Sequence, residues 1–190
     1  MSRFFWVRHG PTHARTMVGW SDLPADLSDT AQLARLSDGL PADAVVISSD
    51  LIRASATADA IAGERLRLPH DPDLREIHFG AWELARFDEV EDQAGLRAYW
   101  DQPGDIRPPG GESWHEVTAR VEAAVDRLLT SHAGRDIVVV AHFGVILTQV
   151  QKALRIGAYE AFSHRIDNLS VTELHHDGAA WNAVRINHLP

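Results

Sequence analysis

Short runs of consecutive apolar residues alternate along this chain with longer segments whose apolar residues recur every three or four positions. Continuous apolar runs of this length are typical of strands buried on both faces of a sheet, and they predict strands at residues 3–7, 44–48 and 136–141. Apolar residues at helical spacing predict helices at residues 28–40, 50–62, 113–132 and 145–154. Strands that alternate with helices in this way predict an α/β domain with right-handed crossovers.

Two further segments depart from this pattern. Residues 63–112 are punctuated by proline and glycine, and only Phe87 to Trp100 has helical spacing, so we expect a small helical and loop cap inserted into the domain. Residues 170–174 and 179–186 alternate apolar and polar positions around Asp177 and Gly178, which predicts a closing hairpin or edge strands. We therefore expect one domain that spans residues 1–190.

Composition and charge narrow the classes of protein. The chain has 190 residues, 45% of them hydrophobic, which suffices for an ordinary core. Its 18 Lys and Arg against 27 Asp and Glu give a net charge of −9, which argues against nucleic acid and acidic membrane as partners. Without cysteine, neither disulfides nor thiolate metal sites can form. The first apolar run is too short for a signal or membrane segment, so we expect a soluble, cytoplasmic protein.

Polar side chains stand directly after three of the predicted strands. Arg8 and His9 follow the first strand, Arg53 lies in the first turn after the second, and His142 follows the strand at 136–141. In open α/β sheets, ligands bind beyond the carboxyl ends of the strands. A helix that begins near His142 would add free N–H groups that favour an anion.

Each of these residues also has an ordinary structural interpretation. His9 and His142 could be hydrogen-bonded residues at an exposed strand end and a helix start, and Arg53 could pair on the surface with Asp50 or Asp59. Two arginines and two histidines at three strand ends are harder to explain by chance. Between Arg8 and Arg53 a phosphate would find two planar, bidentate donors. The residues therefore favour a local phosphate site.

Six motifs with these residues resemble, in content and order, those of the histidine phosphatase superfamily, which includes cofactor-dependent phosphoglycerate mutases and broad-specificity phosphatases. They cover nearly the whole chain and are Val7-Arg8-His9-Gly10 with Thr12; Gly19-Trp20-Ser21-Asp22; Ser48 to Ala54 with Thr57-Ala58; Leu74 to Glu83; Pro109-Gly110-Gly111-Glu112-Ser113; and Val140-Ala141-His142-Phe143-Gly144. The segments around Trp82 and Gly110 look most like the α-ribazole phosphatase and broad-specificity branch. The resemblance implies a three-layer α/β/α sandwich around a mostly parallel mixed sheet.

The resemblance also implies the role of each site residue. His9 would be the nucleophile that forms a phosphohistidine, Arg8, Arg53 and His142 would bind phosphate, and Glu76 would be the proton donor. The substrate would be a small phosphorylated metabolite, hydrolysed without a metal or other cofactor. Nearby Arg charges should keep the His9 imidazole neutral, and burial of Glu76 would suit it to proton transfer. The rival carboxylate is Glu83, which could instead cap a loop.

This chain departs from the family pattern around the expected pocket. Pro11 stands where Glu or Gln is usual, and Arg15 stands where an Asn commonly touches phosphate. Phe143 replaces a glycine after the distal histidine. Candidate substrate-binding residues are therefore Thr12, Arg15, Trp20, Glu83 and Phe143, with Trp82 as a further aromatic wall.

Three other functions compete with the phosphatase. Phosphoglycerate mutases of this clan are usually longer, with insertions that exclude water, whereas this chain is compact. A non-catalytic anion-binding member of the fold is disfavoured by the full set of site residues. A metallohydrolase is disfavoured because the sequence has no clustered metal ligands. The sequence leaves the oligomeric state open, a homodimer included.

Overall fold

A six-stranded mixed sheet forms the centre of the computed structural model, which describes residues 1–190. The strand order is β3-β2-β4-β1-β5-β6, parallel from β3 to β1 and antiparallel from β1 to β6. The bounds are Ser2–Arg8 (β1), Val45–Ser48 (β2), Leu66–Arg67 (β3), Asp136–Ala141 (β4), Val171–His176 (β5) and Trp181–His188 (β6). The three predicted buried strands and the closing hairpin are confirmed, as is the mostly parallel mixed sheet.

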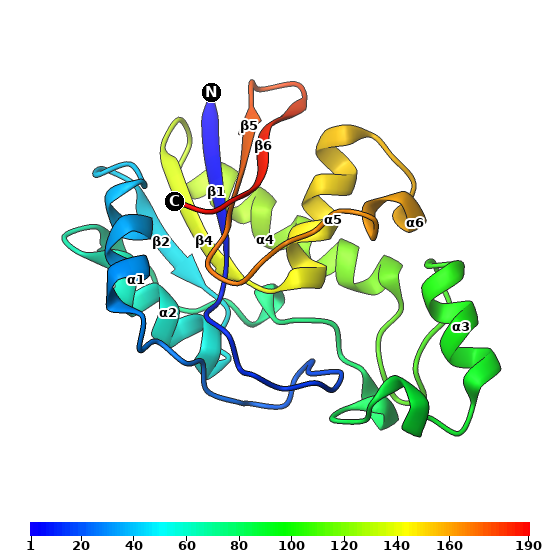
Figure 1. The fold of residues 1–190 in the computed structure, drawn as a ribbon. Helices are drawn as coiled ribbons and strands as arrows, with labels where there is room; N and C mark the ends of the chain where they lie inside the picture. The colour runs from blue at the N-terminus through cyan, green and yellow to red at the C-terminus, as the bar shows by residue number, and fades with distance from the viewer.

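Helices cover both faces of this sheet, which gives the expected three layers (Figure 1). In Figure 1, α1 and α2 lie on one side of the strands and α4 and α5 on the other, while α3 stands apart from the sheet. The bounds are Thr30–Asp38 (α1), Ile52–Ala62 (α2), Gln93–Asp101 (α3), Trp114–Ser131 (α4), Phe143–Leu154 (α5) and Ala158–Ala161 (α6). The sequence pattern predicted all of the longer helices but not the single turn of α6.

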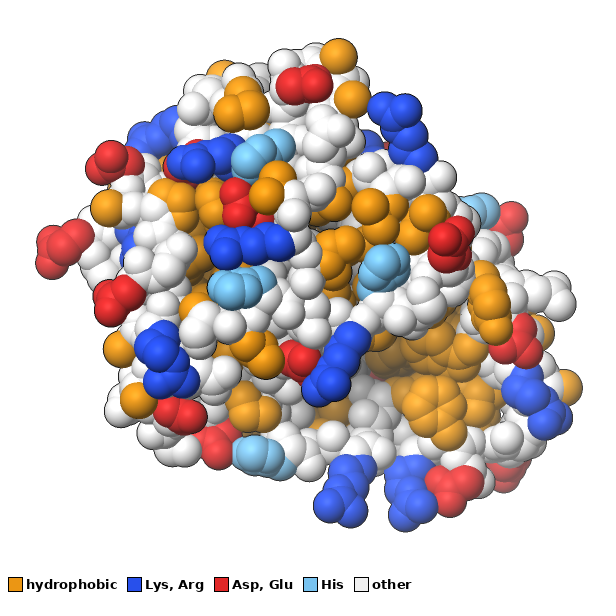
Figure 2. Space-filling model, turned by 45° about the horizontal axis from the view of Figure 1, so that its top comes forward, with side chains coloured by type: hydrophobic (Ala, Val, Ile, Leu, Met, Phe, Trp, Pro, Cys, Tyr) orange, Lys and Arg blue, Asp and Glu red, His pale blue; other side chains and the backbone are white.

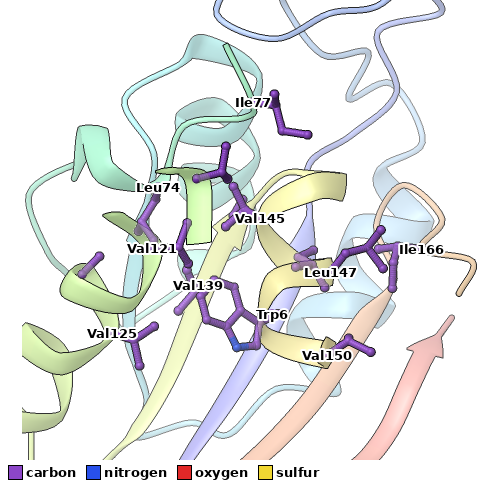
Figure 3. Packing of buried hydrophobic residues seen from close by; sticks show 14 of the residues in the cluster. Trp6, Leu74, Ile77, Val121, Val125, Val139, Val145, Leu147, Val150 and Ile166 are labelled. Atoms are coloured by element: carbon purple, nitrogen blue, oxygen red, sulfur yellow. The ribbon is translucent and has the colours of Figure 1, made fainter. Parts of the chain in front are cut away.

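Apolar side chains pack in two separate layers because successive residues of a strand point to opposite faces. In β1, Phe4 and Trp6 belong to the larger cluster, and Phe5 and Val7 belong to the smaller one on the other face. The larger cluster packs the sheet against α4 and α5, with Trp6 near its centre (Figure 3). Burial on both faces therefore explains why the central strands carry continuous apolar runs.

The segment predicted as a cap differs in its details from the expectation. Its first residues form β3, the edge strand that pairs with β2, so residues 66–67 belong to the sheet rather than to an insertion. A strand of two residues is too short to show the alternation of apolar and polar residues that would predict it. The predicted helix from Phe87 to Trp100 is divided into a single 3-10 turn, Phe87–Glu89, and α3, because Asp92 caps α3 through the backbone N–H of Gly95. No helix is long and apolar enough to span a membrane.

Candidate active site

The carboxyl ends of β1, β2 and β4 meet at one edge of the sheet. Arg8 lies opposite Ala141 in the parallel pairing of β1 and β4, and Ser48 lies opposite Val140 in the pairing of β2 and β4. His9 and His142 are the residues that follow β1 and β4, and their ring centroids are 5.0 Å apart. The register of the strands thus brings the residues of the predicted phosphate site together.

A cavity of about 220 Å³ opens at this edge. Its walls contain four of the five residues predicted to carry the reaction, namely Arg8, His9, Arg53 and Glu76, together with nine others: Thr12, Ala14, Thr16, Met17, Val18, Phe79, Phe87, Trp100 and Phe143. The fifth, His142, is fully buried, and its ring centroid lies 5.0 Å from that of His9.

Hydrogen bonding fixes the tautomer of His9. Nδ1 lies 2.7 Å from the carbonyl oxygen of Gly10, which can only accept, so Nδ1 carries the proton and Nε2 keeps its lone pair. No protein group bonds Nε2. Burial, followed by the positive charges of Arg53 and Arg8, lowers the pKa of His9 to about 3. His9 is 6% exposed, so the exposed strand end considered from the sequence is wrong.

This low pKa predicts an acid dependence of stability. The folded state keeps His9 neutral down to a pKa of about 3 while the unfolded chain takes up a proton near 6.5, so stability falls as pH drops through this range. Between pH 7 and 5 the loss that His9 contributes should be about 2 kcal/mol. Urea unfolding of the wild type and His9→Ala at both pH values checks this. An equal pH dependence in the two proteins would contradict a neutral, buried His9.

Arg8 and Arg53 point their guanidinium groups into the cavity from different elements. Arg53 Nη1 and Nη2 donate to the carbonyl oxygens of Ser21 and Gly19, at 2.9 and 2.6 Å, and Arg8 Nη1 donates to that of Ile166 at 2.6 Å. Each terminal nitrogen keeps a second hydrogen. The nitrogen Nε of Arg8 is buried without a partner. Both cations therefore have donors left for an anion.

The surface ion pair considered for Arg53 is wrong. Asp50 accepts from Arg75, and Asp59 accepts from Arg67. Arg53 itself is 1% exposed and has no carboxylate within ion-pair distance. A buried guanidinium without an ion pair is costly, and a bound anion would compensate its charge.

His142 presents one ring nitrogen without a partner. Its Nε2 lies 2.7 Å from the hydroxyl oxygen of Ser49, and its Nδ1 is buried and unbonded. Burial, followed by the neighbouring His9 and Arg53, lowers the pKa of His142 well below its usual value. Buried polar atoms are nearly always hydrogen-bonded, and Nδ1 is available to bond a ligand or a water molecule.

Glu76 places its carboxylate at the amino end of α5. The backbone N–H of Gly144 donates to both carboxylate oxygens, at 3.0 and 3.2 Å, and that of Ile77 donates at 3.0 Å. Burial raises the pKa of Glu76 more than these bonds and the charges of Arg53 and Arg8 lower it. The result is a carboxyl that holds its proton to higher pH than usual, beside His9 in the same cavity.

A methyl group at Gly144 should displace the carboxyl group of Glu76 and the side chain of Ile77. A Cβ there would lie 2.6 Å from Glu76 Oε1, so the carboxyl must move. We expect Gly144→Ala to lower kcat on an alkyl phosphate by about 10- to 100-fold, the cost of misplacing a reacting group by roughly 1 Å. Gly157→Ala is the matched control, because a Cβ there meets nothing within 4 Å. Equal kcat values in the two variants would show that the Glu76 carboxyl is not constrained as described.

Glu83 organises a loop instead of facing the cavity. Its carboxylate accepts from the backbone N–H groups of Gly19, Trp20 and Phe79 and from the hydroxyl of Ser21. Burial raises the pKa of Glu83, but these hydrogen bonds together lower it below its usual value. The loop it holds supplies the carbonyl oxygens that bind Arg53. Glu83 therefore caps this loop and does not line the cavity.

Of the remaining candidate substrate-binding residues, some line the cavity and others do not. Thr12 and Phe143 line the cavity, whereas the exposed Arg15 does not, although its neighbours Ala14 and Thr16 do. Trp20 donates from its indole to the carbonyl oxygen of Glu76 and is not on the cavity wall. Trp82 is buried in the core, as expected of most aromatic residues.

Other functional positions were not found from the sequence. Arg120 donates to the carbonyl oxygens of Asp73, Arg75 and Glu76 and to both carboxylate oxygens of Glu112, so it fixes the backbone that carries Glu76. The position of Arg120 within a predicted helix gave no sequence signal of this role, although its partner Glu112 belongs to one of the six motifs. Phe79, Phe87 and Trp100 form an aromatic part of the cavity wall, and of these only Phe79 belongs to a motif recognised in the sequence.

This chain belongs to the histidine phosphatase superfamily (branch 1), whose family model matches residues 4–189. A bifunctional protein of Mycobacterium tuberculosis is 32% identical over 94% of the chain, which spans only about half of that relative's length, 52%. The "Probable phosphoglycerate mutase GpmB" of Serratia proteamaculans is 29% identical over 96% of the chain and 89% of its own length.

Solved structures share the whole architecture. Bacillus stearothermophilus YhfR is 28% identical over 100% of this chain and 98% of its own, with a TM-score of 0.91. A mycobacterial glucosyl-3-phosphoglycerate phosphatase in complex with VO3 is 28% identical over 98% of each chain, with a TM-score of 0.83. An α-ribazole phosphatase from Shigella flexneri, 23% identical over 97% of this chain and 96% of its own with a TM-score of 0.82, shares the fold.

Proposed function

We propose that the protein is a metal-independent phosphomonoester hydrolase that acts on a small phosphorylated metabolite through a phosphohistidine at His9. The observation that carries this proposal is the state of His9: its Nδ1–H is bound to the Gly10 carbonyl, and burial with Arg53 and Arg8 keeps the ring neutral. A neutral imidazole beside two guanidinium groups combines a nucleophilic lone pair with a site for the phosphoryl group.

In the first step, His9 Nε2 attacks phosphorus in line as the bond from phosphorus to the ester oxygen breaks. Glu76 gives its proton to the departing oxygen, so the alcohol leaves neutral and Glu76 becomes a carboxylate. Arg8, Arg53 and His142 Nδ1 bind the phosphoryl oxygens, whose charge is redistributed in the transition state. The amide of Gly144 stabilises the new carboxylate.

In the second step, water replaces the alcohol. The Glu76 carboxylate removes a proton from water as its oxygen attacks phosphorus and the bond to His9 Nε2 breaks, which releases phosphate and restores the neutral imidazole. The raised pKa of Glu76 supports both roles, because a carboxyl group that titrates nearer to neutral pH can give and retake the same proton. Glu83, with its lowered pKa and loop contacts, lacks that property.

The alternative is phosphoryl transfer to a second alcohol, as in a phosphoglycerate mutase. The probable mutase among the relatives favours it, and it would use the same first step. It differs only in the acceptor that takes phosphoryl from His9. A non-catalytic anion-binding role is disfavoured because such a role would require neither a neutral nucleophile nor an adjacent carboxyl group with a raised pKa.

A hydrolysis screen over a panel of phosphomonoesters, with EDTA present, tests the proposal. We expect release of inorganic phosphate at a rate that the chelator does not change, because no step requires a metal. Loss of activity in EDTA would indicate a metallohydrolase. Transfer of phosphate to a second phosphoglycerate, with little free phosphate, would indicate a mutase.

Vanadate should bind where the phosphoryl group is proposed to lie. In a crystal soaked with vanadate or phosphate we expect the anion to contact Arg8, Arg53, His9 and His142, with Nδ1 of His142 as a donor, because its unbonded state would then be relieved. Electron density from a diffraction data set checks this. An anion bound elsewhere in the molecule would contradict the assignment of all four residues.

A further inference from the structure

The cavity presents few polar groups to the part of a substrate that is not phosphate. Seven of its 13 lining residues are hydrophobic. Its ionisable residues are those that the proposed function uses for the phosphoryl group and the proton. Besides these, the side-chain groups that can hydrogen-bond the remainder of the substrate are the hydroxyls of Thr12 and Thr16 and the indole N–H of Trp100, which is buried without a partner.

Four aromatic side chains form most of the apolar wall. The ring of Trp100 lies 6.1 Å from that of Phe79 and 5.9 Å from that of Phe87, measured between centroids, and Phe162 supports it from outside the wall at 5.3 Å. Phe143 faces the guanidinium of Arg8, whose Cζ is 5.5 Å from the ring centroid. On the side of the molecule where α3 lies, Figure 2 shows hydrophobic side chains gathered in a hollow of the surface.

Phe87 stands out because its side chain is both part of this wall and 54% exposed. Apolar area left in contact with water gains roughly 25 cal/mol for each Å² that a ligand covers. Rings whose centroids lie 4.5–7 Å apart gain further from edge-to-face or offset packing. An aromatic group of a substrate would therefore be held by Phe87 and Trp100.

The charges in the cavity argue against a second anionic group on the substrate. Arg8 and Arg53 are the only cations on its walls, and both are assigned to the phosphoryl group. A substrate carboxylate would lie near Glu76 without a partner, and an unpaired charge removed from water is strongly destabilising. Arg15, which lies in sequence between the wall residues Ala14 and Thr16, is the other candidate counter-ion for such a carboxylate, but its side chain is exposed and is not part of the wall.

We propose that the enzyme selects phosphate monoesters of apolar alcohols that carry one aromatic ring and no second anionic group. This inference rests on the phosphatase function proposed above and names its substrate class. An apolar cavity of about 150 Å³ accommodates benzene, so a cavity of about 220 Å³ has room for one ring beside the phosphoryl group. The ring stacks on Phe87 and Trp100 while His9 and the two arginines hold the phosphoryl group.

The test compares three esters of primary alcohols, so that leaving-group chemistry differs little among them: 2-phenylethyl phosphate, glycerol 3-phosphate and 3-phosphoglycerate. We expect kcat/KM to be about 10- to 100-fold higher for the phenylethyl ester than for glycerol 3-phosphate, because burial of one aromatic ring contributes a binding free energy of that size. We expect 3-phosphoglycerate to be the poorest, because its carboxylate finds no counter-ion.

Phe87→Ala tests the wall directly, and the exposure of Phe87 makes loss of the fold unexpected. The ratio of kcat/KM for the phenylethyl ester to that for glycerol 3-phosphate should fall about fivefold or more. Tyr159→Ala is the matched control, because it removes an aromatic ring that is 64% exposed and lies outside the cavity. The ratio should not change in this control.

The outcomes separate this inference from the proposed function. If none of the esters is hydrolysed and no phosphohistidine forms, the phosphatase function fails and the inference fails with it. If the three esters are hydrolysed equally well, or 3-phosphoglycerate is preferred, the enzyme is a phosphatase and only the aromatic selectivity is wrong. A preference for 3-phosphoglycerate that Arg15→Ala abolishes would identify Arg15 as the counter-ion and overturn the charge argument.

Discussion

Replacing His9 with alanine is expected to lower kcat for every phosphomonoester by more than about 10⁴-fold, because loss of a nucleophile removes the whole covalent pathway. Wild-type enzyme mixed with a labelled substrate and quenched should carry phosphate on His9, in a bond that is labile to acid and stable to alkali. The variant should carry none. Steady-state rates, together with mass spectrometry of the quenched protein, make both measurements.

Two controls make this loss interpretable. His9 is buried, so far-UV circular dichroism and thermal unfolding must show that the variant still folds. His115→Ala removes an exposed histidine whose side chain pairs with Asp105 outside the cavity, and it should keep wild-type rates. Residual turnover of His9→Ala within tenfold of the wild type, or label on a serine in place of His9, would contradict the nucleophile assignment.

The sheet and its helices were predictable because their signals are periodic. Residues 137–141 are apolar without interruption since β4 lies between β2 and β1 and is covered on both faces. Residues 113–132 repeat with helical spacing since α4 buries only one face. By contrast, β3 has two residues and α6 one turn, lengths at which no period can be read. The predicted helix from Phe87 to Trp100 is divided at Asp92 by a single capping hydrogen bond, and the longer helical spacing of its apolar residues hid this boundary.

The site residues in regular elements were likewise predictable, and those in irregular segments were not. Arg8, His9, Arg53 and His142 were predictable because each is fixed to the end of a strand or to the first turn of a helix. Arg15 was not, because in the irregular loop after β1 side-chain directions follow no period, and its neighbours face the cavity instead. The aromatic wall depends on residues from separate segments, Phe87 and Trp100, which only the folded cap brings together.

Glu76 and Glu83 show what sequence position cannot decide. Both are carboxylates in one motif, seven positions apart. Their environments differ in the number of hydrogen bonds that stabilise the charged form: four donor groups, from Gly19, Trp20, Phe79 and Ser21, converge on Glu83 within 3.2 Å, whereas burial dominates at Glu76. These opposite pKa shifts suit Glu76 to proton transfer and Glu83 to a fixed charge that holds a loop.

Glu76→Gln should therefore cripple the hydrolysis of alkyl phosphates, by roughly 10²- to 10⁴-fold, because the departing alkoxide needs a proton that glutamine cannot give. With p-nitrophenyl phosphate the phenolate leaves readily, so phosphorylation of His9 should be affected far less. Water attack on phosphohistidine still needs a base and should become slow. Stopped-flow absorbance should then show a burst of nitrophenol followed by a slow steady state.

Glu83→Gln is the matched comparison for this leaving-group dependence. Because Glu83 acts on the reaction only through the loop that binds Arg53, the variant should slow alkyl and nitrophenyl substrates alike, by roughly tenfold or about 1.4 kcal/mol of barrier. The leaving-group test thus separates a proton donor from a positioning residue even if both variants lose activity. A strong leaving-group dependence in Glu83→Gln, with a uniform loss in Glu76→Gln, would reverse the assignment of the acid and leave the assignment of His9 intact.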